Sequence, residues 1–282
     1  MDEVFKNFLE NQLNTRIVSV SPLQGGDINQ VYHLKTQLQN LVIKTNNARK
    51  FPGMFAAEEK GLKALAATHT LRIPRVILEG TYKEKSFLIL EYIQRGVPKK
   101  DFWPYFGQQL ARLHIHTRSH FGFDTDNYIG SLPQYNTHFE NAGTFYVEMR
   151  LRPQFKTAFD NHFTFQHLEK LFRNIQTIIP EEKPSLIHGD LWSGNYLVDK
   201  CGDPCLIDPA VAYAPREMDL AMMLLFGGFQ KELFNEYQEV YPLEKNWETR
   251  IDLWQLYYLL VHLNLFGSGY YEQVKNIISK YR

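Results

Sequence analysis

Segments that favour strands and segments that favour helices are segregated along this chain, and this segregation constrains its fold more than any other feature. Residues 16–46 divide into three short runs rich in β-branched residues, and two more such runs follow at 74–80 and 86–93. A segment rich in Ala, Leu and Glu, with helical spacing, lies between them at 51–68. From Asp101 onward the pattern is mainly helical. Grouped strands followed by grouped helices predict an α+β fold.

The composition changes at 92–100, where Gly96 and Pro98 interrupt an otherwise apolar segment. A chain of 282 residues also exceeds what one hydrophobic core usually organises. We therefore expect two lobes, with a small antiparallel sheet and one main helix in residues 1–93 and a mainly helical lobe in residues 94–282.

The overall charge and hydropathy exclude several classes of protein. Lys plus Arg and Asp plus Glu both number 31, and no basic stripe is interleaved with aromatic residues, so we expect no nucleic-acid partner. The two strongest apolar runs, 220–226 and 256–266, are shorter than the ~18 residues of a membrane span. The N-terminus does not resemble a signal peptide, and the only cysteines are Cys201 and Cys205. The sequence therefore predicts a soluble cytoplasmic protein without a membrane partner.

The stretch "IHGDLWSGNYLVDKCGDPCLIDPA" at 187–210 carries the clearest chemical signal. Asp190, Asn195 and Asp208 are spaced so that a hairpin would bring them into one cleft. In phosphoryl transfer from ATP, an Asp orients the substrate hydroxyl while an Asn and a second Asp hold Mg²⁺. We predict Asp190 as the base and Asn195 and Asp208 as magnesium ligands. Taken singly, Asp190 could instead cap a helix and Asp208 could sit in an Asp-Pro turn.

A lysine and a glutamate could supply the other half of this chemistry. Lys44 lies on the third predicted strand, and Glu58 lies on the helix that follows. An ammonium that reaches the phosphates and is held by a helix carboxylate is the arrangement that ATP-dependent phosphoryl transfer uses. Glu59 is a rival to Glu58, because helical phase separates the two only weakly.

Two further segments could contact the nucleotide. A Gly-Gly turn at 24–29 could lay backbone N–H groups over phosphates or merely close a hairpin. The segment at 90–93 could present backbone groups to adenine or be a buried edge strand. The predicted contacts in these segments are Gly25, Gly26, Asp27, Glu91, Tyr92 and Ile93.

Several residues near this stretch favour supporting roles. His188 would bond backbone carbonyls of the loop, because no acid–base partner is evident for it. Asp219 begins an apolar helix, where it could cap the helix or bond the backbone of the loop. Phe226 and Phe229 could belong to the core or to a substrate cleft.

Six segments together resemble the fructosamine kinase, or ketosamine-3-kinase, family. They are "GGDIN" (25–29), "FAAEEKGLKAL" (55–65), "FGFDTDNYIGSLPQYN" (121–136), "PSLIHGDLWSGN" (184–195), "LIDPAVAYAPREMDLAMMLLFGGF" (206–229) and "LYYLLVHLNLFGSGY" (256–270). They span nearly the whole chain. The family has a protein-kinase-like fold that also occurs in aminoglycoside and choline kinases.

The resemblance implies an ATP- and Mg²⁺-dependent kinase that phosphorylates the O3 hydroxyl of a ketoamine, the adduct of a sugar with an amine such as lysine. Such an activity would serve protein deglycation. By the family pattern, the sugar would face Asp190, with Trp192, Asp219 and Phe229 as candidate substrate contacts. The sequence does not set the sugar, the amine or the oligomeric state.

The chain departs from the family pattern at two places. Many members carry paired tryptophans after the Gln-x-Asn motif, where this chain has His138 and Gly143. Some carry a redox-active cysteine in the phosphate loop, which is absent from "GGDIN".

Two alternative functions remain open at this stage. One is phosphorylation of an aminoglycoside or an amino alcohol, which the slight excess of Lys and Arg over Asp and Glu in residues 95–185 disfavours. The other is a catalytically inactive binding module, which predicts the loss of Lys44, Asp190, Asn195 or Asp208, all of which are present.

Overall fold

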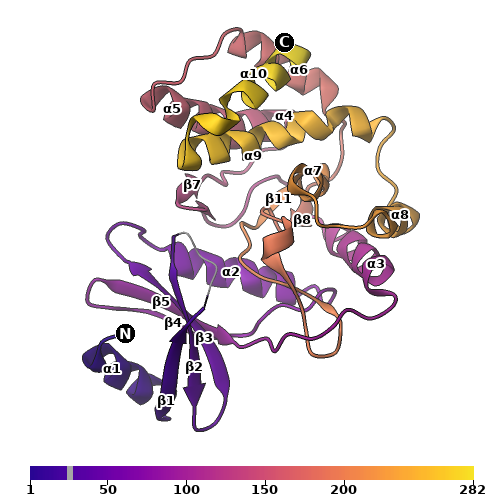
Figure 1. Cartoon of the computed structure of the whole chain (residues 1–282). Coiled ribbons are helices and arrows are strands. Elements are labelled where there is room, and N and C mark those ends of the chain that lie inside the picture. Colours follow the sequence, from indigo (N-terminus) through magenta and orange to yellow (C-terminus); the bar gives the residue numbers. More distant parts are fainter. Residues whose placement is uncertain (24–27) are drawn as a thin grey trace.

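The computed structural model describes residues 1–23 and 28–282, with a sheet-rich part toward the N-terminus and a helical part toward the C-terminus (Figure 1). The sheet has five antiparallel strands in the order β1-β2-β3-β5-β4. The strands are β1 (Ile17–Pro22), β2 (Gln30–Thr36), β3 (Asn40–Asn47), β4 (Val76–Tyr82) and β5 (Lys85–Glu91). All five strands and the main helix between them lie where the sequence predicts them.

Helices cover the sheet at its edge and toward the helical part. The side chain of Asp2 caps α1 (Glu3–Leu13), and Phe5 and Leu9 of this helix are buried against the sheet with Leu34 and Phe87. The main helix α2 (Met54–Ala66) buries Phe55 and other apolar residues between the sheet and the rest of the chain. Figure 1 shows α2 between the sheet and the helical part.

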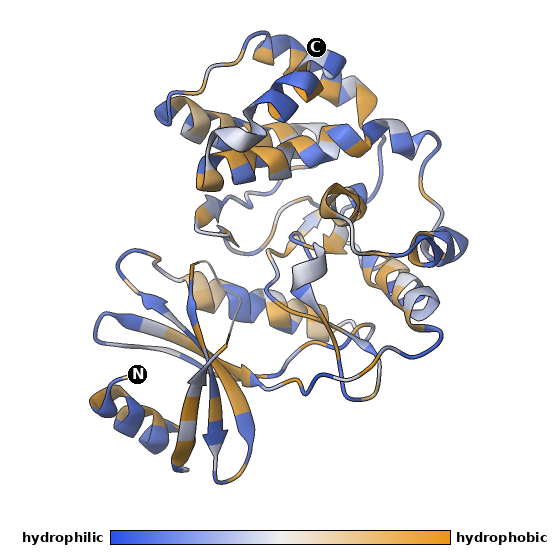
Figure 2. Ribbon diagram, viewed as in Figure 1, coloured by the Kyte–Doolittle hydropathy of each residue, from blue (hydrophilic) through white to orange (hydrophobic). Residues whose placement is uncertain are grey.

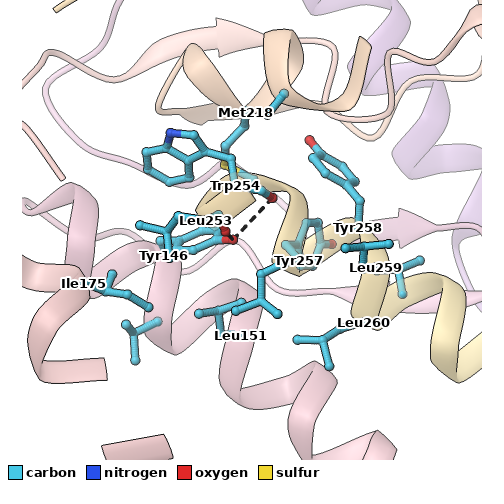
Figure 3. Packing of buried hydrophobic residues seen from close by; sticks show 14 of the residues in the cluster. Tyr146, Leu151, Ile175, Met218, Leu253, Trp254, Tyr257, Tyr258, Leu259 and Leu260 are labelled. Atoms are coloured by element: carbon cyan, nitrogen blue, oxygen red, sulfur yellow. Dashed lines mark hydrogen bonds between the residues drawn. The ribbon is translucent and has the colours of Figure 1, made fainter. Parts of the chain in front are cut away.

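The helical part is built around α9 (Ile251–Phe266), which is buried along most of its length. In Figure 3, Tyr146, Trp254 and Tyr257 pack together, and the Tyr146 hydroxyl donates to a backbone carbonyl of α9. Figure 2 shows that α7 (Glu217–Phe226) is mainly hydrophobic, whereas α8 (Lys231–Val240) is largely hydrophilic. The other helices are α3 (Phe102–His114), α4 (Ala142–Phe145), α5 (Arg152–Asp160), α6 (Leu168–Ile178), α7 (Glu217–Phe226), α8 (Lys231–Val240) and α10 (Tyr271–Tyr281).

Three short antiparallel strand pairs interrupt the helices. The predicted hairpin is present as β9 (Tyr196–Val198) and β10 (Pro204–Leu206). The pair β8 (Ser185–Ile187) and β11 (Ala212–Ala214) and the hairpin β6 (Asn127–Ile129) and β7 (Leu132–Gln134) complete the set. A π-helical segment, Tyr146–Leu151, precedes α5 within the part of the chain where the sequence predicts mainly helices.

One hydrophobic cluster joins the two parts of the molecule. It includes Phe55 and Leu62 of α2, Leu88 of β5, Phe106 of α3 and Leu191 of the loop after β8. Shared burial of this kind fixes the sheet relative to the loops that carry the candidate site. Among the residues that the structure describes, no helix combines the length and hydrophobicity needed to cross a bilayer.

Candidate active site

A cleft of about 1370 Å³ separates the sheet and α2 from the helical part. Lys44 and Glu58 lie on one wall, and Asp190, Asn195 and Asp208 lie on the other. Ligand pockets usually measure ~300–1000 Å³, so this cleft has room for two ligands side by side. Every side chain predicted for the metal and the base therefore faces the same space.

Asp190 and Asn195 are joined by the short loop between β8 and β9. Asn195 Nδ2 donates to the backbone oxygen of Asp190 at 2.8 Å and to Asp190 Oδ2 at 3.1 Å. This contact leaves Oδ1 of each side chain as an acceptor. Asp190 is half-buried, and Asn195 is almost fully buried. A hydroxyl could therefore approach Asp190 from the cleft, while Asn195 offers an oxygen to a cation.

The Asp190 carboxyl has an unusual acidity. Burial, and then the negative charge of Asp208, raise its pKa to about 7, although the hydrogen bond from Asn195 opposes this change. A carboxylate with a pKa near neutrality is a better proton acceptor than an ordinary aspartate. The neighbouring carboxylates of Asp190 and Asp208 would also attract a cation to Asp208.

Lys44 spans the cleft from the third strand. Its Nζ lies 2.5 Å from Glu58 Oε1 on α2 and 2.7 Å from Asp208 Oδ1. Burial alone would lower the pKa of Lys44, but these two carboxylates outweigh burial and raise it, so the amine stays charged. Glu59 instead pairs with Lys63 on the surface of α2. The structure thus brings Lys44 to Glu58 and not to its rival.

His188 and Asp219 support the loop that carries Asp190 through hydrogen bonds to the backbone. His188 Nε2 donates to the backbone oxygen of Ile207 at 2.9 Å, and burial lowers the pKa of the imidazole. Asp219 is fully buried in α7, and its two carboxylate oxygens accept the backbone N–H groups of His188 and Gly189 at 2.8 Å. His114 lies 3.2 Å from the same carboxylate.

The burial of Asp219 corrects one expectation. A side chain without exposed surface, whose oxygens are already engaged by the loop, does not face a substrate. Asp219 supports the loop that carries Asp190, as its position at the start of an apolar helix also allowed.

Trp192 and Phe229, the other candidate substrate contacts, lie in different surroundings. Trp192 is 40% exposed and lines the cleft, where its ring covers Gly194. A Cβ at Gly194 would come within 2.2 Å of that ring, so only glycine permits this placement. Phe229 packs in an aromatic cluster with Trp103, Phe106 and Tyr196. The structure therefore gives Phe229 a packing role, which corrects its expectation as a substrate contact.

Three aromatic residues that line the same cleft as Trp192, namely His262, Phe266 and Tyr270, were not singled out from the sequence, whereas Phe226 was named as a possible cleft residue. His262 of α9 contacts the rings of Phe226, Phe266 and Tyr270, with centroids 4.7 to 5.5 Å apart, and all four residues line the cleft. His262 Nδ1 donates to the backbone oxygen of Tyr258 at 2.7 Å, and burial lowers the pKa of this imidazole. The apolar run at 256–266 concealed His262 and Phe266, because its pattern is also typical of a core helix.

The opposite end of the cleft could take a planar base. Val31 and Val42 of the sheet and Leu197 and Ile207 of the helical part all line the cleft, and Val42 pairs with Leu90 of β5, next to Glu91. The predicted contacts Glu91, Tyr92 and Ile93 line it as well. The Glu91 carboxylate is engaged by Arg72 at 2.9 Å, so backbone groups are what this segment can offer a ligand. Gly25, Gly26 and Asp27 lie outside the described residues.

The donor chemistry fits a magnesium ion. Asn195 and Asp208 present an amide oxygen and a carboxylate to the same space, and Mg²⁺ prefers a few such oxygen ligands together with water and phosphate oxygens. Lys44 neutralises part of the Asp208 charge and would share phosphate binding with the metal.

His138 and Gly143, which stand where many family members have tryptophans, lie outside the described lining of the cleft. His138 stacks on His120, and Gly143 packs against the backbone of α6, where a Cβ would meet Gln176 at 3.0 Å. Cys201 is exposed and Cys205 is buried, and both are free thiols.

Comparisons with known proteins identify the family of the chain. The model of the family described as "Fructosamine kinase" matches residues 1–282. A probable ketoamine kinase of Enterococcus faecium is 40% identical over 96% of both chains. A protein-ribulosamine 3-kinase of Arabidopsis thaliana, described as chloroplastic, is 37% identical over 95% of this chain and 83% of the relative.

A solved structure carries the same fold. The crystal structure of a candidate fructosamine-3-kinase of Haemophilus somnus superposes with a TM-score of 0.90 at 26% identity, covering 98% of this chain and 96% of the other. The expected two-part, kinase-like α+β architecture is thereby confirmed.

Proposed function

The chain belongs to the fructosamine kinase family, whose members are phosphotransferases that act on a hydroxyl group, and we propose that it transfers the γ-phosphoryl group of ATP to the O3 hydroxyl of a ketoamine. The observation that carries this proposal is the convergence of Asp190, Asn195 and Asp208 on one cleft opposite Lys44. Phosphoryl transfer from ATP requires a hydroxyl-orienting carboxylate, metal ligands and a phosphate-binding cation in this arrangement.

The nucleotide would occupy the part of the cleft that Glu91, Tyr92 and Ile93 line. Val31 and Val42 of the sheet would lie on one face of the base, and Leu197 and Ile207 of the helical part on the other. The backbone at Glu91 to Ile93 would contact the edge of the base. Lys44 would then contact the phosphates, held in place by Glu58. Asn195 and Asp208 would hold Mg²⁺, which supplies positive charge to the phosphates when it is bound.

The acceptor would occupy the other end. There Asp190 would accept a hydrogen bond from the reacting hydroxyl and orient it toward the phosphoryl group. Trp192 and the aromatic group around His262 would surround the rest of the sugar and amine. The relatives named for ketoamines and ribulosamines support a ketoamine acceptor, and the name of the Arabidopsis relative supports the 3-position.

A role in protein deglycation follows if the amine of the ketoamine is a lysine side chain of a protein. An aminoglycoside is a weaker candidate, because a polycationic drug needs several carboxylates beyond the metal site. On the acceptor side of the cleft, the described lining is mainly aromatic and aliphatic.

The decisive experiment measures ATP consumption with purified protein and Mg²⁺ against ribulosyl-lysine, fructosyl-lysine, an aminoglycoside and choline. Turnover restricted to the ketoamines, with the phosphate located at O3 by NMR, would support the proposal. Phosphorylation of the drug or of choline alone would contradict it.

A further inference from the structure

We infer that Asn127 and Gln134, the first and last residues of the β6–β7 hairpin, are positioning residues that hold the backbone after Asp208 in the conformation needed for metal binding. The inference rests on the proposed function, because it assigns Asp208 to a magnesium–nucleotide complex. Neither residue was assigned a role in the site from the sequence; Asn127 lines the cleft, whereas Gln134 lies behind the described lining and contacts it through Ala210 and Asn127.

The two side-chain amides bond consecutive carbonyls of the segment between β10 and β11. Gln134 Nε2 donates to the backbone oxygen of Ala210 at 3.0 Å, and Asn127 Nδ2 donates to that of Val211 at 2.8 Å. Ala210 and Val211 are almost fully buried, and both precede the first residue of β11. Buried carbonyls outside a strand need such partners, so the two amides complete the hydrogen bonding of this segment.

The segment contains a backbone conformation that needs external support. Asp208 has φ of +56°, in the left-handed region, where a residue other than glycine costs roughly 1–3 kcal/mol. Such a conformation persists only where neighbouring contacts fix it. The direction in which the Asp208 carboxylate leaves the chain depends directly on this angle.

Hydrogen bonds fix the backbone on both sides of Asp208. Before it, the N–H of Ile207 donates to the backbone oxygen of Asn195 at 3.0 Å; after it, the N–H of Ala210 donates to that of His188 at 2.9 Å. These two contacts come from the loop that carries Asp190. The contacts of Gln134 and Asn127 come from a separate hairpin, so the segment is held between two independent supports.

Hydrogen bonds also fix the orientation of the side-chain amides of Gln134 and Asn127. Gln134 Oε1 accepts from the hydroxyl of Tyr257, and Asn127 Oδ1 accepts from Gln134 Nε2 and from Asn136 Nδ2. Rotating either amide by half a turn would place oxygen against oxygen, which leaves one productive arrangement. Asn136 is held in turn by Arg150, which is 1% exposed. Tyr257 is seen in Figure 3 within the core of the helical part.

This arrangement anchors a metal ligand to the rigid core. Residues that orient the ligands of a metal site commonly change metal affinity by ~10- to 100-fold when replaced. We therefore expect replacement of Gln134 to weaken binding of the magnesium–nucleotide complex while leaving the nucleotide's own contacts with the protein intact.

The test compares ADP binding with and without Mg²⁺ by calorimetry. Gln134→Met removes the donor to Ala210 and keeps similar volume. The expected result is a loss of about tenfold or more in affinity for MgADP, with an unchanged affinity for ADP in EDTA. Equal weakening of both, or no change in either, would overturn the inference.

A closely matched control exists on α9. Gln255 Nε2 donates to the backbone oxygen of Ala221 at 3.0 Å, and this bond is also buried. Gln255→Met should lower the melting temperature comparably and leave the effect of Mg²⁺ on ADP affinity unchanged. A loss specific to MgADP in this control as well would show that general loosening of the fold is the cause, and would also overturn the inference.

Two further variants cover a failure of Gln134→Met to fold. Gln134→Glu keeps the acceptor for Tyr257 but cannot donate to Ala210, and Asn127→Ala releases Val211 instead; both should show the same loss specific to MgADP. The proposed function fails separately, because it fails if Mg²⁺ does not strengthen ADP binding to the unmodified protein.

Discussion

Lys44 Nζ and Asp208 Oδ1 lie 2.7 Å apart, although 164 positions separate these residues in the sequence. This contact joins β3 to the segment that follows β10 across the cleft. It places a buried ammonium and a half-exposed carboxylate where the phosphates and a metal would meet. The ion pair therefore connects the sheet with the metal-binding side of the proposed site.

Replacing Lys44 with Met should reduce kcat/KM for ATP by about ten- to a hundredfold, because a charge-assisted hydrogen bond to phosphate contributes ~1.5–3 kcal/mol. Initial rates over a range of ATP concentrations would measure this. Lys63→Met is the control, since the Lys63 amine is exposed and pairs with Glu59 on the outer face of α2. An equal loss in both variants would contradict a phosphate contact by Lys44.

Asp190→Asn should lower kcat by about 10²- to 10⁴-fold, the range expected when a general base is removed. The affinity for ATP, measured by calorimetry, should change little, because Asp190 faces the acceptor end of the cleft. Asp203→Asn on the hairpin, which removes only a surface partner of Lys99, should leave turnover unchanged. Full activity of Asp190→Asn would remove Asp190 from the reaction.

Asp190→Asn should also be more stable than the unmodified protein at neutral pH in the absence of metal. The folded-state pKa of Asp190 is raised from 3.8 to about 7, so the folded state holds a proton that the unfolded state loses between these values. Stability therefore falls as pH rises from about 4 to about 7 and stays low above. Asp190→Asn removes this penalty, so we expect its melting temperature in EDTA to exceed that of the unmodified protein at pH 8. The two melting temperatures should converge below pH 4, and a constant difference across this window would contradict the prediction.

Asp219→Asn should destabilise the fold by about 2–4 kcal/mol, because an amide cannot accept both loop N–H groups and a buried hydrogen-bonded carboxylate is costly to replace. Burial acts to raise the Asp219 pKa, but His114, His188 and the loop N–H groups outweigh it and lower the pKa. Its contribution is therefore present above the ordinary aspartate range and is lost as pH falls through the lowered value.

Thermal melts from pH 3 to pH 8 would measure this dependence, with the largest difference between Asp219→Asn and the unmodified protein at the upper end. Asp252→Asn, which removes only a surface partner of Lys280, serves as the control. If the difference in melting temperature between Asp219→Asn and the unmodified protein grows toward acid pH, the ionised Asp219 carboxylate does not stabilise the fold as predicted.

The sequence was sufficient for the architecture and the polar centre of the site. Strand runs before Ile93 and helical spacing after Asp101 reflect local periodicity, which a sequence records directly. Asp190, Asn195 and Asp208 lie within one short stretch, so a single hairpin brings them together and spacing alone reveals them.

What the sequence concealed depends on contacts between distant segments. The β6–β7 strands have three residues each, too few for a period to be visible, yet they deliver Asn127 and Gln134 to the segment after Asp208. Phe226 and Phe229 are three residues apart in one apolar segment, and only tertiary packing places the first in the cleft and the second in an aromatic cluster.

Trp192→Ala should raise KM for the ketoamine by about tenfold, since withdrawing an aromatic ring from a bound sugar forfeits ~1–2 kcal/mol of contact. KM for ATP should stay nearly constant, because in the proposed arrangement the base lies between Val31 and Val42 and the residues opposite them, and not against Trp192. Phe159→Ala is the control: Phe159 is similarly exposed, at 44%, but lies on α5 against Phe165. If KM for ATP rises with KM for the ketoamine, Trp192 acts on the whole cleft, and the division into nucleotide and acceptor ends is wrong.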